Sequence, residues 1–112
     1  MDIFEFSHDD RYVVAPTGRL DALTSSTLRE KLTNLINEGK KYILLDCSSL
    51  DYVSSAGIRV LFETIHKLGA VQGKLLCCSP SADVKRIFDM VDLQADMPIY
   101  ESREEALKAF DE

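Results

Sequence analysis

The chain has 112 residues, of which 46% are hydrophobic and 29% are charged. This length and composition are typical of one globular domain, so we expect residues 1–112 to form a single domain that folds without disulfides or a structural metal. Nineteen acidic residues against thirteen basic ones give a formal charge of −6. Because the basic residues are scattered along the chain, this pattern disfavours direct binding of nucleic acid.

No stretch reaches the roughly 18 to 20 apolar residues that a membrane span requires. The first residues, Met1–Glu5, are acidic where a secretory signal is basic. We therefore expect a cytoplasmic protein that is not embedded in a membrane. The cysteines Cys47, Cys77 and Cys78 form an odd set without a C-x-x-C motif, and an adjacent pair on a strand points to opposite faces. We interpret them as buried reduced thiols and predict no metal site.

The first third of the chain predicts a β-hairpin followed by a helix. Short β-rich runs at Ile3–Phe6 and Tyr12–Ala15 flank the polar turn His8–Arg11. Pro16–Gly18 then ends the second strand. From Thr24 to Asn37 the apolar residues recur on one face of a helix.

This first helix has the spacing of a capping box at Thr27 and Glu30, and Gly39 lies where a helix stops. Tyr42–Leu45 is a continuous apolar run, which is typical of a strand buried on both faces, so we expect it to be the central strand. A second amphipathic helix is predicted over 58–69.

In the last third of the chain, predicted strands and helices again alternate. The pattern predicts a buried strand at Lys74–Cys78, a turn and cap at Ser79–Ser81 and a helix with an apolar stripe over Val84–Val91. A short strand at Pro98–Tyr100 and a helix opened by the capping-box spacing of Ser102–Glu105 complete the chain. The order ββαβαβαβα predicts an α/β fold with a mixed β-sheet and helices packed against it.

No pattern for catalysis or nucleotide binding stands out. His8 and His66 lack metal-ligand spacing, and Gly69–Lys74 leads into a strand where a phosphate loop leads into a helix. We expect neither enzymatic activity nor a cofactor.

One constellation suggests function: Asp46 ends a buried strand, and Ser54–Gly57 opens the second helix. In open α/β sheets, ligands and partners meet the carboxyl ends of strands, where helix N-termini present free N–H groups. A serine there could accept a phosphate, with the small residues Ala56 and Gly57 letting a partner approach closely. Alternatively, Ser54 or Ser55 only caps the helix.

Three stretches resemble the STAS domain, the module of bacterial anti-sigma factor antagonists: Gly18–Ala22, Ile43–Val53 and Ser54–Leu61. The resemblance covers nearly the whole chain and implies a STAS-type fold. In that family the last stretch typically reads Asp-Ser-Ser/Thr-Gly-Leu-Gly, and its first serine is phosphorylated by a partner serine kinase that is also the anti-sigma factor. Alignment on Gly57 places the phosphoacceptor at Ser55.

The resemblance also implies a partner-binding surface made of Asp21, Ser54, Ser55, Ala56, Gly57 and Arg59. Three of these residues depart from the family pattern: Ser54 stands at the usual aspartate position, Ala56 stands at the usual second Ser/Thr position, and Arg59 replaces what is often glycine. The domain would bind the kinase and so release a sigma factor, phosphorylation would end the binding, and a phosphatase would reset the switch. Any ATP would belong to the kinase, and the domain itself would be a monomer or weak dimer. The alternative is a STAS subunit of a lipid- or membrane-transport complex without a phosphorylation cycle.

Overall fold

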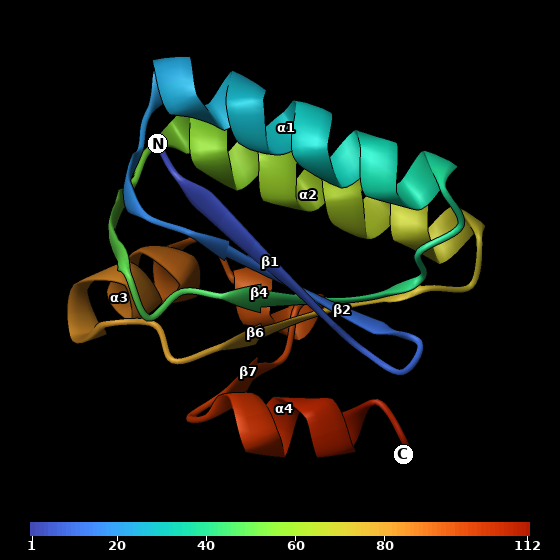
Figure 1. Ribbon diagram of the computed structural model, residues 1–112. Coiled ribbons are helices and arrows are strands. Elements are labelled where there is room, and N and C mark those ends of the chain that lie inside the picture. The colour runs from blue at the N-terminus through green and yellow to red at the C-terminus, as the bar shows by residue number, and fades with distance from the viewer.

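The computed structural model describes residues 1–112 (Figure 1). Its strands and helices are β1 (Ile3–His8), β2 (Arg11–Pro16), β3 (Gly18–Leu20), α1 (Ala22–Asn37), β4 (Tyr42–Asp46), β5 (Leu50–Val53), α2 (Ser55–Ala70), β6 (Lys74–Cys78), α3 (Ala82–Met90), the 3₁₀ helix η1 (Leu93–Ala95), β7 (Ile99–Tyr100) and α4 (Arg103–Ala109). No helix is long and apolar enough to cross a membrane.

Five of the strands form one sheet in the order β1-β2-β4-β6-β7. β1 is antiparallel to β2, while the other neighbours are parallel. The apolar run Ile43–Leu45 lies in the middle strand of this sheet and is fully buried, as expected for a strand covered on both faces. The predicted mixed α/β fold and its central strand are confirmed.

The helices lie on both faces of the sheet. In Figure 1, α1 and α2 run side by side over one face, and α4 lies on the opposite face. Side chains of the central strand alternate between these layers: Ile43 and Leu45 join the larger core, whereas Leu44 joins the smaller core beneath α4. The three cysteines are free and buried, and the adjacent pair Cys77 and Cys78 faces opposite cores, as predicted.

The chain contains two strands beyond the predicted order. β3 and β5 form a separate two-stranded parallel sheet, so the observed order is βββαββαβα followed by β7 and α4. With three and four residues, these strands are too short to show a hydrophobic period. Their hydrogen bonds join segments that are distant in the sequence, which no local pattern reports.

The first helix also begins earlier than predicted. Asp21 is its N-cap and forms a capping box with Thr24, so the capping box expected at Thr27 and Glu30 is wrong. Both of those residues lie inside α1, where the backbone N–H groups are already bonded within the helix.

Candidate functional site

The N-termini of α1 and α2 lie next to each other because β3 leads into α1 and β5 leads into α2. These two strands are parallel, and the Ser54 N–H donates to the Leu20 carbonyl at 2.8 Å. The helices therefore start at the same end of the molecule (Figure 1). At α1 the Asp21 carboxylate caps the first N–H groups, whereas at α2 the Ser54 hydroxyl caps only Gly57 and the helix start keeps N–H groups without a partner.

The two serines at the start of α2 have different roles. Ser54 is the N-cap, and its hydroxyl accepts a hydrogen bond from the Gly57 N–H at 3.3 Å. Ser55 is the first residue of the helix, and its side chain is exposed. The capping role that the sequence left open between the two serines falls to Ser54, which leaves the hydroxyl of Ser55 accessible.

Gly57 is buried and faces inward. A Cβ atom at this position would lie 2.8 Å from two side-chain atoms of Leu20 and 3.0 Å from Cγ1 of Val53. Those distances are closer than carbon atoms approach without displacement. The missing side chain lets α2 pack against β3 and β5, so the expectation that Gly57 opens the surface to a partner is wrong. Ala56, beside it, is half-buried.

Arg59 is exposed and lies four residues after Ser55, which places the two side chains on the same face of α2. The next acidic residue along this face, Glu63, is already paired: Nε of Arg29 donates to its carboxylate at 2.9 Å. This hydrogen bond lowers the pKa of Glu63. Arg59 itself makes no ion pair in the structure, so its guanidinium is available to an anion arriving at Ser55.

Asp21, the other predicted surface residue, caps α1. Its carboxylate accepts hydrogen bonds from the N–H groups of Leu23 at 3.1 Å and Thr24 at 3.0 Å, and its own N–H donates to the Thr24 hydroxyl at 2.9 Å. Hydrogen bonds from Thr24 are the main cause of its lowered pKa. The tight turn before it places Gly18 at a φ of +79°, a region that favours glycine.

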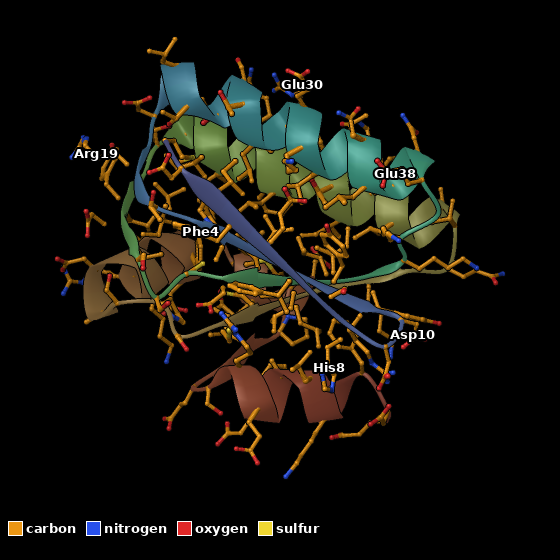
Figure 2. The ribbon with its side chains drawn as sticks, in the orientation of Figure 1. Phe4, His8, Asp10, Arg19, Glu30 and Glu38 are labelled. Carbon is orange, nitrogen blue, oxygen red and sulfur yellow. The ribbon has the colours of Figure 1, made fainter.

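Tyr52 and Leu23, at this end of the molecule, were missed as site residues from the sequence, whereas Arg19 lies in the turn Gly18–Asp21 that the resemblance placed at the rim of the binding surface. Arg19 on β3 lies opposite Tyr52 on β5, with its guanidinium carbon 4.3 Å from the centre of the tyrosine ring. Figure 2 shows Arg19 on the outside of the molecule, near the start of α1. Leu23, in the first turn of α1, is 83% exposed. For Leu23, the signal available in the sequence was a leucine outside the apolar stripe of its helix.

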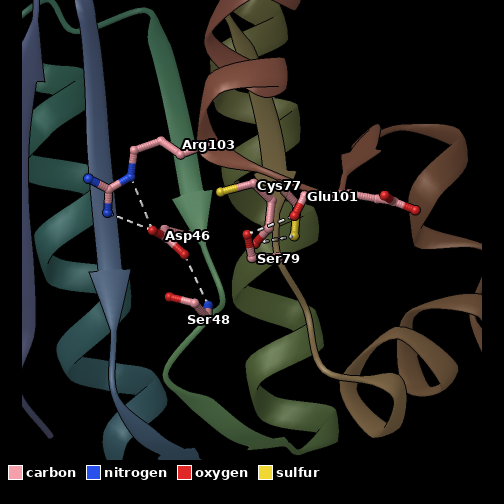
Figure 3. Close-up of polar contacts among 7 residues, drawn as sticks. Asp46, Ser48, Cys77, Ser79, Glu101 and Arg103 are labelled. Atoms are coloured by element: carbon pink, nitrogen blue, oxygen red, sulfur yellow. Dashed lines mark hydrogen bonds and ion pairs between the residues drawn. The ribbon is translucent and has the colours of Figure 1, made fainter.

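Asp46 does not belong to this site. It lies on the face of the sheet that α4 covers, where Arg103 donates two hydrogen bonds to Oδ2 at 2.6 and 3.2 Å (Figure 3). Burial alone would raise the pKa of Asp46, but the hydrogen bonds from Arg103 and Ser48 outweigh it and lower that pKa. The predicted constellation of Asp46 with Ser54–Gly57 is therefore wrong: Asp46 anchors the start of α4 to the central strand.

The site is an open surface and not an enclosed cavity. A shallow hollow of 380 Å³ lies beside it, lined by residues of the N-terminus, the turn before β3 and the start of α1, among them Arg19 and Asp21. No group of three or more His, Cys, Asp or Glu side chains could hold a metal ion.

The mixed sheet with helices on both faces corresponds to a known class of domain. The model of the STAS domain family matches residues 5–106, and the chain belongs to this family.

Within the family, the chain resembles proteins named as anti-sigma factor antagonists. BtrV of Bordetella bronchiseptica, a candidate anti-sigma factor antagonist, is 30% identical over 102 residues, which cover 91% of this chain and 88% of BtrV. The anti-sigma-B factor antagonist of Staphylococcus epidermidis is 28% identical over 104 residues, which cover 93% of this chain and 96% of that protein.

A solved structure shares the fold at lower identity. The unphosphorylated form of the anti-sigma factor antagonist SpoIIAA superposes with a TM-score of 0.85 at 22% identity, covering 98% of this chain and 96% of that one. The phosphorylated form of SpoIIAA, from Bacillus, superposes with a TM-score of 0.77 at 22% identity, covering 97% of this chain and 99% of that one.

Proposed function

We propose that this protein is an anti-sigma factor antagonist whose binding to its partner is controlled by phosphorylation of Ser55. The observation that supports this proposal is that the two serines have different structural roles. Ser54 uses its hydroxyl to cap α2, whereas Ser55 presents an exposed hydroxyl on a rigid element. A kinase active site can reach Ser55 without breaking a hydrogen bond that the fold needs.

The unphosphorylated surface suits a protein partner. Exposed Leu23 offers an apolar contact, and Arg19, stacked on Tyr52, offers a cation at the same end of the molecule. Side chains of these types, aromatic and arginine above all, are enriched where proteins bind one another. The partner is a serine kinase that is also the anti-sigma factor, and its capture releases the sigma factor. ATP binds to the kinase.

Phosphorylation adds about −1.5 to −2 charges at neutral pH. At the first turn of α2 this charge is favoured by the unpaired N–H groups, so the fold persists. In the complex the same charge loses its water, which costs several kcal/mol for an unpaired charge, and pairing with Arg59 offsets only part of that cost. Release of the partner follows from that cost, and a phosphatase that acts on phosphoserine restores binding.

The experiment is a pull-down from a lysate of the source bacterium with the wild type, Ser55→Ala and Ser55→Asp. We expect wild type and Ser55→Ala to retain a serine kinase, and Ser55→Asp to lose it while its circular dichroism spectrum stays unchanged. Incubation with that kinase and ATP, followed by mapping of the modified peptide, should place the phosphate on Ser55. A phosphate on Ser54 alone would refute the assignment, and retention of transport proteins in place of a kinase would favour a transport subunit.

A further inference from the structure

β1 forms an open edge of the five-stranded sheet, with no strand beyond it (Figure 1). The Thr17 N–H donates to the Asp2 carbonyl at 3.0 Å. Because hydrogen-bonded and non-hydrogen-bonded pairs alternate along an antiparallel ladder, the even-numbered residues of β1 bond to β2. The backbone N–H and C=O groups of Ile3, Glu5 and Ser7 therefore point outward without a partner.

The even-numbered side chains of β1 form a row on the face that α4 leaves partly uncovered. Phe4 is 55% exposed and Phe6 is 45% exposed. The guanidinium of Arg103 lies 4.7 Å from the ring centre of Phe6, which places this row on the α4 side. Figure 2 shows Phe4 and His8 along β1, at the sheet edge and at the hairpin end. Two aromatic rings on an open edge are an apolar surface that an additional strand would cover.

Most of the usual protections of an edge strand are missing from β1. Natural edges are blocked by proline, by charged side chains and lysine above all, by bulges or by a short length. β1 has six residues, contains neither proline nor lysine, and pairs with β2 in an unbroken register. Its one charged side chain, Glu5, is held in an ion pair with Lys31 of the same copy, so the backbone of β1 stays open to another strand.

We propose that this edge binds the β1 edge of a second copy of the chain, antiparallel and with its twofold axis at Glu5. In that register Phe4 lies opposite Phe6 of the second copy, and Asp2 lies opposite His8 of the second copy. Ile3 and Ser7 of the two copies exchange backbone hydrogen bonds on either side of the central Glu5 pair. All six residues of β1 are used, and the two sheets join into one.

The occupant is a second copy because the edge complements itself. Each aromatic ring meets another aromatic ring, and each acidic end meets a histidine, as a twofold interface requires. The two central carboxylates are compensated, since Nζ of Lys31 lies 2.6 Å from Glu5 in each copy. A single pair of strands buries less surface than a standard interface, so the dissociation constant should be about 10 µM or weaker. This proposal does not depend on phosphorylation of Ser55.

Cysteine cross-linking tests the register. In an antiparallel hydrogen-bonded pair the Cα atoms are about 5.5 Å apart, within the range of a disulfide. Glu5→Cys should therefore form a covalent dimer under mild oxidation. The native cysteines are buried, so they should not compete for the cross-link. Ser7→Cys is the matched control: its two copies would lie roughly 13 Å apart along the strands, and it should stay monomeric on a non-reducing gel. Equal cross-linking of both variants, or of neither, would overturn the proposal.

Sedimentation velocity over a concentration series tests the dimer itself. The wild type should show reversible association, and Phe4→Lys should raise the dissociation constant at least tenfold. Met90→Lys is the control, because Met90 is also highly exposed, at 78%, but lies at the end of α3. Circular dichroism checks that both variants are folded. A wild type that stays monomeric at every concentration, or equal effects of the two substitutions, would refute the proposal.

Discussion

A methyl group added at Gly57 tests how closely α2 must approach the small sheet. The Cβ of Gly57→Ala would lie 2.8 Å from Leu20 side-chain atoms and 3.0 Å from Val53, and both of those residues are buried. Overpacking of this kind costs about 1 to 3 kcal/mol. Replacing a helical glycine with alanine returns about 0.5 to 1 kcal/mol through the unfolded chain. The difference is a net loss of about 0 to 2.5 kcal/mol in the free energy of unfolding, against a gain at the control position.

The matched control lies in the same helix. A Cβ atom at Gly69 would meet nothing within 4 Å, so Gly69→Ala should stabilise the protein by about 0.5 to 1 kcal/mol. Urea unfolding followed by circular dichroism measures both variants, with the slope of the transition as a check on two-state behaviour. If Gly57→Ala were as stable as Gly69→Ala, the close packing of α2 on Leu20 and Val53 would be refuted.

Three further predictions concern other sites. Asp21→Ala should lower the melting temperature through loss of the capping box, and titration calorimetry on the folded variant should show weaker partner binding; unchanged affinity would leave Asp21 a purely structural role. Arg103→Ala removes both hydrogen bonds to the buried carboxylate of Asp46 and should cost about 1 to 2 kcal/mol at neutral pH, less than a fully buried pair because Arg103 is partly exposed. The pKa of Asp46 is lowered in the folded state, so this stabilisation is present above the unfolded pKa of about 4 and is lost as the pH falls through the folded pKa. The free energies of unfolding of wild type and Arg103→Ala, measured by urea titration, should therefore converge in acid. A difference that stays constant with pH would contradict the assignment. Burial raises the pKa of Cys78 to about 12, and the hydrogen bond with Cys77, together with burial, raises the pKa of Cys47. A thiol reagent at pH 8 should therefore modify Cys47 and Cys78 only after urea unfolds the chain, and rapid labelling of the native protein would show that the core opens.

Local patterns predicted the elements that are long enough to show a period. The apolar run at Tyr42–Leu45 identified the central strand, because a strand covered on both faces has no polar side to present. The apolar stripes of α1 and α2 identified two helices, because each helix covers the sheet with one face only. The serine caps of α3 and α4, at Ser81 and Ser102, were also readable from the sequence. In each case the signal lies within one element.

The functional surface needed contacts between distant segments. The sequence placed two serines at the start of α2, but which of them is exposed depends on where the helix begins. Ser54 becomes the cap because β5 pairs with β3 and the Ser54 N–H donates to the Leu20 carbonyl. Gly57 faces inward for the same reason, since Leu20 and Val53 lie against it. Asp46 lies beneath α4 because successive side chains of a strand point to opposite faces, and its partner Arg103 comes from the last helix. The sequence by itself determined the helices, five of the seven strands and the chemistry available at their ends, because these depend on neighbouring residues. Only the tertiary structure decided which side chains meet and which remain exposed, because those outcomes depend on packing between segments that are far apart along the chain.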